Sequence, residues 1–157
     1  TLDAQSGYES AITSLLVALA GGNIIHDAAG LMDFCLCASV EKLVIDNEIL
    51  GMVLRAIRGI EVNPESLAFD VMKQVGPGGH FVATRHTRQK FRKECYFPQI
   101  SSRESYKEWQ EKGAPTTRDR ALEKVHEILK QPFASVIPEQ TRKQIIEQTP
   151  GLHTDVF

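Results

Sequence analysis

Gly76-Pro77-Gly78-Gly79-His80-Phe81-Val82-Ala83 is the stretch that decides how the fold of this 157-residue chain is interpreted. It lies between two helical patterns, and it opens with the glycine and proline that tight turns favour. The apolar run Phe81-Val82-Ala83 then predicts a short buried strand. A turn that leads from a helix into a strand is typical of alternating α/β architecture rather than of a purely helical bundle.

A second short strand is predicted upstream, at Asn23-Ile24-Ile25-His26. Before it, apolar residues recur every three or four positions from Tyr8 to Leu19, which indicates an amphipathic helix. Asp3 or Ser6 is expected to cap the start of that helix, and Gly21-Gly22 to end it, because glycine adopts the left-handed conformation at little cost.

Helical patterns fill most of the remaining chain. A long helix is expected over residues 39–58, and Asn63-Pro64 has the form of a cap followed by proline at the first helical position. Ser101-Ser102-Arg103-Glu104 has the form of a capping box. Further helices are predicted over 88–92 and 118–130 and after Pro138, and residues 149–157 are expected to be irregular.

The composition excludes several classes of protein. Apolar residues make up 42% of the chain and charged residues 24%, which is typical of a globular protein. The net charge of −2 argues against nucleic-acid binding. No apolar run approaches the length of about 20 residues that a membrane helix needs. The three cysteines fit neither a disulfide framework nor a zinc knuckle, which favours a cytoplasmic location.

The order of the predicted elements is typical of the end of an α/β barrel, over residues 1–98, followed by a helical extension over residues 99–157. Two short strands cannot form an autonomous sheet. The chain also starts at Thr1, without an initiator methionine. We therefore interpret it as the C-terminal part of a larger α/β enzyme, and we expect it to be predominantly helical with exposed apolar surface.

Three stretches of the chain resemble a known family. They are Asp3-Ala4-Gln5-Ser6-Gly7-Tyr8-Glu9 continuing through Leu19-Ala20-Gly21-Gly22-Asn23; Leu50-Gly51-Met52 with Arg58-Gly59-Ile60-Glu61-Val62; and Val75-Gly76-Pro77-Gly78-Gly79-His80-Phe81 with His86-Thr87, Phe91-Arg92 and Phe97-Pro98. In order and spacing they are similar to the C-terminal region of the trimethylamine methyltransferase family of corrinoid-dependent methyltransferases, over most of residues 1 to about 130.

This resemblance implies an eight-stranded TIM (β/α)8 barrel and transfer of a methyl group from a methylamine to cob(I)alamin. The cobalamin is carried by a separate corrinoid protein, and no metal is bound directly. One branch of the family acts on trimethylamine and uses pyrrolysine, upstream of the matched stretch. The other acts on quaternary amines such as glycine betaine, and our interpretation leans slightly towards it. The expected partners are the corrinoid protein and a small methylamine, with neither nucleic acid nor membrane. Homo-oligomerisation is left open.

The candidate substrate-binding residues are His26, Gln5, Tyr8, Asp3 and His80. His26 follows a predicted strand, where barrel enzymes place functional groups, but a histidine bonded to backbone in the core explains it equally well. Asp3, Gln5 and Tyr8 could line a cation pocket, or could be a helix cap and a buried tyrosine. His80 could face substrate or simply cap neighbouring backbone. The catalytic residues themselves are not assigned.

Other interpretations of the sequence have less support or remain as alternatives. His80, His86 and Cys95 lack zinc-ligand spacing, and the glycine-rich turn is not followed by the lysine of a phosphate loop. The charges from Arg88 to Lys93 are a candidate contact for the corrinoid protein. A helical interaction module without chemistry is the alternative function. A split enzyme, divided at a stop codon that is read as an amino acid, is another.

Overall fold

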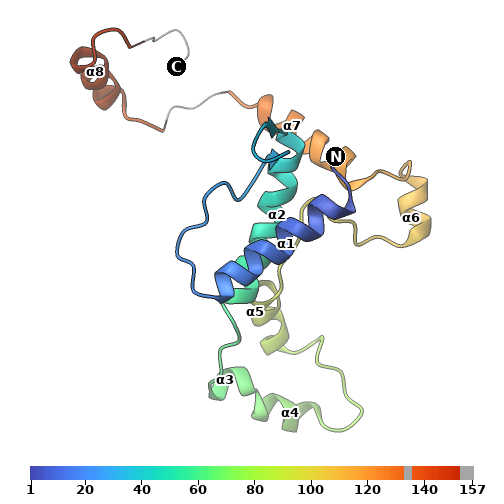
Figure 1. The fold of residues 1–157 in the computed structure, drawn as a ribbon. Coiled ribbons are helices and arrows are strands. Elements are labelled where there is room, and N and C mark those ends of the chain that lie inside the picture. Colours follow the sequence, from blue (N-terminus) through green and yellow to red (C-terminus); the bar gives the residue numbers. More distant parts are fainter. Residues whose placement is uncertain (133–135, 153–157) are drawn as a thin grey trace. The chain divides into compact units, whose positions relative to one another are not determined.

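The computed structural model describes residues 1–132 and 136–152, and it confirms that the chain is predominantly helical (Figure 1). The chain divides into two compact units, Thr1–Val125 and His126–Phe157. The elements among the described residues are α1 Ala4–Leu19, β1 Leu31–Met32, β2 Cys37–Ala38, α2 Val40–Ile57, α3 Pro64–Leu67, α4 Phe69–Val75, α5 Arg85–Glu94, α6 Tyr106–Glu111, α7 Thr117–Leu129 and α8 Glu139–Gln148.

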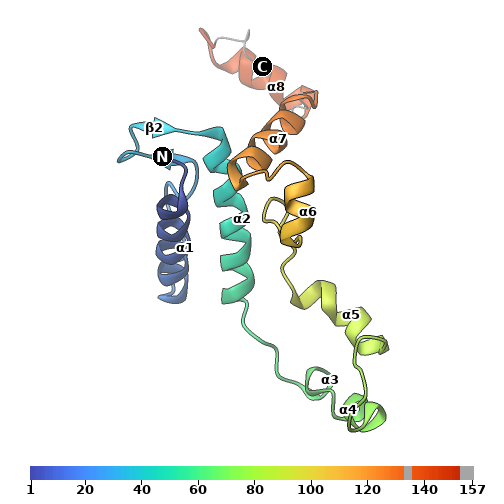
Figure 2. The ribbon, with the colours of Figure 1, turned by 90° about the vertical axis from the view of Figure 1, so that its right-hand side faces the viewer.

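Local capping signals determine where α1 and α2 begin. The Asp3 carboxylate accepts a hydrogen bond from the Ser6 N–H, and the Ser39 hydroxyl accepts one from the Lys42 N–H, as expected of helix N-caps. The chain leaves α1 through Gly21, which has a φ of 89°. Figures 1 and 2 show α1 lying alongside α2, and this helix pair dominates the packing of the first unit.

Neither predicted strand forms. Residues 23–26 and 81–83 are irregular or turn in this structure, so the strand predictions for Asn23–His26 and Phe81–Ala83 are wrong for the described residues. A strand needs a partner with which to exchange backbone hydrogen bonds, and an apolar run cannot supply that partner itself. The TIM-barrel portion of the predicted fold therefore stays a prediction, as does the division of the chain at residue 98.

The strands that do form make a hairpin that the sequence analysis missed. Leu31 pairs with Ala38 and Met32 with Cys37 in an antiparallel ladder. The chain reverses through Asp33-Phe34-Cys35, three consecutive residues with φ of 51°, 52° and 68°. Left-handed backbone costs a non-glycine residue about 1–2 kcal/mol, so this tip is strained. It contains no glycine that would have indicated a turn in the sequence.

The third predicted helix is divided in two. Ala68 adopts φ 53° between α3 and α4, and Gly76 ends α4 with φ 67°. The capping box is real but lies four residues later than predicted, with Ser105 and Glu108 at the start of α6. The shift is explained by a tertiary contact, because the N–H and hydroxyl of Ser101 donate to the Glu48 carboxylate.

The last helices follow the sequence pattern closely. α7 covers Thr117–Leu129, and Pro138 precedes α8, as predicted. Of the tail that was expected to be irregular, residues 149–152 form a turn region and 153–157 lie outside the described residues. None of the described helices combines the length and apolarity that crossing a membrane requires.

The apolar core of the described residues is small. Its buried members are Val53, Ile100, Ala121 and Val125. Ile100 joins α2 to α7, because its N–H donates to Glu48 and its carbonyl accepts from Arg120. Of the other buried apolar residues, Val53 lies on α2, and Ala121 and Val125 lie on α7.

Apolar side chains on one face of α1 and one face of α2 are exposed. Leu16 of α1 is 60% exposed and Leu54 of α2 is 63% exposed. On α1 the exposed residues recur at three- and four-residue spacing, and on α2 two such pairs lie about three helical turns apart, so each set forms a stripe. The α1 stripe is Tyr8, Ile12, Leu16 and Leu19, and the α2 stripe is Val40, Leu43, Leu54 and Ile57. The expected exposure of apolar surface is confirmed.

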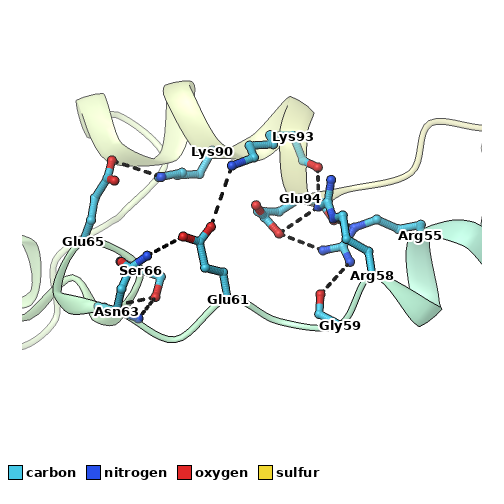
Figure 3. A network of polar contacts seen from close by, with 10 residues as sticks. All are labelled: Arg55, Arg58, Gly59, Glu61, Asn63, Glu65, Ser66, Lys90, Lys93 and Glu94. Carbon is cyan, nitrogen blue, oxygen red and sulfur yellow. Dashed lines mark hydrogen bonds and ion pairs between the residues drawn. The ribbon is translucent and has the colours of Figure 1, made fainter.

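Ion pairs join α5 to the end of α2 and to the residues that follow it (Figure 3). Glu94 accepts from Arg55 Nη2 at 2.8 Å and from Arg58 Nη2 at 3.0 Å. Farther along, Lys90 pairs with Glu65 at 3.0 Å. Charged contacts therefore position α5, and they are partly exposed to solvent.

Candidate functional site

A cavity of about 270 Å³ lies between the first turns of α1, the β1 end of the hairpin and the start of α2. Its lining combines carboxylates and an amide with two apolar side chains and one lysine. The lining residues are Thr1, Asp3, Gln5, Ser6, Glu9, Ser10, Leu31, Met32, Asp33 and Lys42. Two of the residues expected to bind substrate, Asp3 and Gln5, are among them.

A buried ion pair lies at this cavity. Lys42 is 3% exposed and Asp46, one helical turn later on α2, is 2% exposed. The Lys42 ammonium lies 2.5 Å from Asp46 Oδ1 and donates to the Ser10 hydroxyl at 2.7 Å. Asp46 Oδ2 accepts the Gly30 N–H at 2.9 Å. One charge pair therefore fixes α1, α2 and the loop before β1 at a single point.

Glycine is required at position 30 for this contact. Gly30 has φ 79°, and a Cβ there would lie 3.3 Å from the Leu43 side chain. Only glycine combines the left-handed backbone with so close an approach to α2 at little cost. The loop can therefore bring its N–H to Asp46 without displacing the helix.

Carboxylates dominate the open part of the cavity, since the Lys42 charge is already paired with Asp46. The Asp3 carboxylate accepts from the Thr1 hydroxyl at 2.6 Å and from the Ser6 N–H at 3.2 Å, and these bonds lower the pKa of Asp3. Glu9 accepts from the Gln5 amide at 2.8 Å. An ionised, acidic lining with apolar neighbours suits a small organic cation better than an anion.

The predicted site residues are placed as follows. Asp3 and Gln5 line the cavity together. Tyr8 belongs to the exposed stripe of α1, and the His26 side chain is 90% exposed, with its Nδ1 2.8 Å from Asp27 Oδ2. His80 is exposed in the turn after α4. The last three are not among the lining residues of this cavity, so their assignment to a substrate site stays a prediction.

The buried charges of α2 were not predicted from the sequence. Lys42 and Asp46 are spaced four apart, on a helix whose other positions are largely apolar, and this spacing is the signal that could have found them. Glu48 is a third buried charge. Its carboxylate accepts from the N–H groups of Gln99, Ile100 and Ser101.

Hydrogen bonding decides the ionisation of Glu48. Burial raises the pKa of its carboxyl, but the bonds from the Ser101 hydroxyl and from three backbone N–H groups together outweigh burial and hold the pKa below its ordinary value. Glu48 is therefore a structural anion that anchors residues 99–101 to α2. Within residues 1–132 and 136–152, no three His, Cys, Asp or Glu side chains are grouped as metal ligands.

Comparison with known proteins matches residues 1–149 to the family model described as trimethylamine methyltransferase (MTTB). Glycine betaine methyltransferase of Desulfitobacterium hafniense strain Y51 is 40% identical over 129 residues, which are 82% of this chain and 27% of the relative. Trimethylamine methyltransferase of Methanosarcina thermophila is 40% identical over 128 residues, which are 82% of this chain and 26% of the relative. The chain thus spans about a quarter of the length of these relatives.

Proposed function

We propose a function for this chain on the basis that it belongs to the trimethylamine methyltransferase family. The protein that contains it transfers a methyl group from a tertiary or quaternary methylamine to the cob(I)alamin of a separate corrinoid protein. The observation on which this proposal rests is the family match over residues 1–149, together with relatives at 40% identity that are named as methyltransferases.

The proposed chemistry explains why an acidic, partly apolar cavity is useful. Cobalt(I) supplies the electron pair of the new carbon–cobalt bond, and the pair of the broken carbon–nitrogen bond stays on nitrogen. A quaternary ammonium therefore leaves as a neutral tertiary amine. Because the positive charge of the substrate fades in the transition state, strong ion pairing would favour the ground state and slow transfer. Orientation of the methyl group matters more than a general acid.

The cavity beside Asp3 and Gln5 is the proposed substrate-cation region. Its carboxylates attract a cation, and Leu31 and Met32 supply apolar contact for methyl groups. We retain Tyr8, His26 and His80 as proposed contributors. The His26 imidazole is the proposed donor to the carboxylate of a betaine substrate.

The exposed apolar stripes support a larger fold. In a (β/α)8 barrel, each outer helix packs its apolar face against the central sheet. The stripes of α1 and α2 have the width and spacing of such faces, and the described residues leave them uncovered. We propose that they pack on the sheet of a TIM barrel in the protein of family length, and that the 157-residue chain alone is inactive.

The choice between trimethylamine and a quaternary amine is a finer proposal. The relatives named for the two substrates are each 40% identical to this chain, so identity does not separate them. We lean towards a quaternary amine. An in-frame amber codon upstream of Thr1 in the gene would contradict that preference, and an ordinary codon would support it.

A helical interaction module without chemistry is the second candidate, and the exposed apolar stripes are the observation that favours it. Such a module would bind protein through those stripes and would have no use for an amine. The two functions therefore separate in one assay of methyl transfer.

The test uses the full-length protein encoded by the gene, with its cognate corrinoid protein held at cobalt(I). Methylation of cobalt is followed by absorbance with trimethylamine, glycine betaine, carnitine and proline betaine. We expect turnover with at least one amine, and none when the 157-residue chain replaces the full-length protein. Absence of turnover with every tertiary and quaternary amine would contradict the proposed function and favour the interaction module.

A further inference from the structure

The cations of α5 are divided between two faces of the helix. On the face that meets the chain after α2, Lys90 pairs with Glu65 at 3.0 Å and Lys93 with Glu61 at 3.8 Å (Figure 3). His86 Nε2 on the same side lies 3.1 Å from the Glu65 carbonyl oxygen. The two lysines and His86 thus have partners within the chain, and these contacts position the helix.

The other face carries Arg85, Arg88 and Arg92, at the spacing of three and four residues that aligns side chains along a helix. All three are exposed. Arg88 donates to the Ala83 carbonyl at 3.4 Å, but no carboxylate in the part of the chain that the structure describes forms an ion pair with any of the three. We call these residues the arginine face.

Two of the three arginines, Arg85 and Arg88, disfavour the start of the helix that carries them, whereas Arg92 lies in its last turn. The first turn of α5 contains no acidic residue, and Arg85 and Arg88 there lie near the positive end of the helix dipole. A positive charge at the start of a helix is unfavourable, because the free backbone N–H groups there already carry partial positive charge. Arg88 and Arg92, four residues apart on the same face, also repel each other. An anionic surface laid over this face would reverse the sign of both effects.

Two features indicate that the anionic surface bound by these arginines belongs to a protein. Arginine binds carboxylates in bidentate geometry, unlike lysine, and arginine with aromatic residues is enriched at protein interfaces. Two aromatic residues that are about half exposed lie close to these arginines in the sequence. Phe81 precedes α5, and Phe91 lies within it. The net charge of −2 on the whole chain disfavours nucleic acid.

We propose that Arg85, Arg88 and Arg92 of α5 dock an acidic surface of a partner protein. The choice of partner rests on the proposed function, which requires a corrinoid protein to approach this enzyme and accept the methyl group. Docking through exposed charges acts mainly on the rate of association and makes binding sensitive to salt.

The test compares two charge-reversal variants of the full-length protein. The first carries Arg85→Glu, Arg88→Glu and Arg92→Glu. The matched control carries the same change at three exposed cations elsewhere, Lys73→Glu, Arg103→Glu and Lys107→Glu. Binding of the cognate corrinoid protein is measured by biolayer interferometry from low to high salt. We expect the first variant to bind at least about tenfold more weakly at low salt and to lose salt dependence, while the control stays within about threefold of wild type.

The outcomes separate this inference from the proposed function, because binding is read without turnover. If wild type methylates cobalt and the arginine variant binds the corrinoid protein as wild type does, the docking face is wrong and the function stands. If wild type binds through the arginine face but transfers no methyl group, the function is wrong and the docking face stands.

Two further readouts sharpen the test. The arginine variant should stay close to wild-type stability in urea, since glutamate is favourable at positions 85 and 88 near the helix start and unfavourable at position 92 in the last turn. Marked destabilisation would assign the arginines a structural role and overturn the proposal. So would loss of binding to a single-stranded RNA probe while affinity for the corrinoid protein is unchanged.

Discussion

In the α1–α2 pair, the buried charges of α2 have close partners, whereas much of the apolar surface of both helices is exposed. Lys42, Asp46 and Ser10 are each matched by a partner a few ångströms away. Leu16 and Leu54, on the same two helices, remain more than half exposed. The charged contacts are finished within the described residues, whereas the apolar stripes lack the surface that would cover them.

This contrast separates two kinds of information in the chain. The polar contacts specify how α1, α2 and the loop before β1 are arranged, since each requires an exact partner. Apolar burial supplies most of the favourable free energy of folding, and the apolar side chains of the two stripes are not buried in this structure. Substituting a buried charge or an apolar residue of a stripe tests this difference.

The largest expected effect comes from breaking the buried ion pair. Lys42→Ala would leave Asp46 buried without its counter-ion, and we expect it to destabilise the full-length protein by about 3–5 kcal/mol. Urea unfolding measures the change. Lys42→Met combined with Asp46→Leu should recover most of the loss, because no buried charge remains unpaired. A loss below about 1 kcal/mol for Lys42→Ala would contradict the role assigned to this pair.

The next effect tests the apolar stripe of α1. If a barrel sheet covers it, Leu16→Ala should destabilise the full-length protein by about 2–4 kcal/mol, as expected of a buried leucine. Thr13→Ala, an exposed position on the same helix, should change stability by less than about 0.5 kcal/mol. Equal small effects of both substitutions in chemical unfolding would show that the stripe faces solvent in the full-length protein.

A substrate-site histidine should affect turnover rather than folding. Loss of a hydrogen bond to a charged group costs about 1.5–3 kcal/mol, so His26→Ala should lower kcat/KM for a betaine roughly ten- to a hundredfold. His86→Ala, which removes a contact to the Glu65 carbonyl, should leave turnover close to wild type. Indistinguishable rates for wild type and both variants would remove His26 from the site.

The smallest effect concerns acid stability. Because the folded-state pKa of Glu48 is lowered, its contribution to stability is complete above the unfolded pKa of about 4.3 and is lost as the pH falls through the folded value. Glu48→Gln should destabilise the protein by about 1–2 kcal/mol at neutral pH and flatten the loss of stability below pH 4.3. An unchanged acid limb in unfolding curves measured across pH would contradict this assignment.

The elements that the sequence predicts well are those with local signals. Asp3 and Ser39 cap α1 and α2, and Asn63-Pro64 opens α3, because a cap is formed by residues three positions apart. The strands at 23–26 and 81–83 fail because a strand depends on a distant partner. The hairpin was missed because Asp33-Phe34-Cys35 turns through left-handed backbone without glycine.

The candidate site shows the same division. Asp3 and Gln5 line one cavity, and their role in substrate binding stays a prediction. Lys42 was missed because its contact with Ser10 lies thirty-two positions away in the sequence. Ser101 and Ser105 each precede a glutamate by three residues, so local sequence cannot choose between them. The contact of Ser101 with Glu48, fifty-three positions away, makes the choice. Non-local contacts are what the sequence pattern leaves undetermined.

Whether a sheet covers the α1 stripe in the full-length protein decides whether this chain is part of a barrel. Hydroxyl-radical footprinting with mass spectrometry would compare the oxidation of Tyr8, Leu16 and Leu19 in the 157-residue chain and in the full-length protein. We expect rapid oxidation of all three in the chain alone and strong protection in the full-length protein. Equal oxidation in both would show that no sheet covers this face, and the barrel proposal would be wrong.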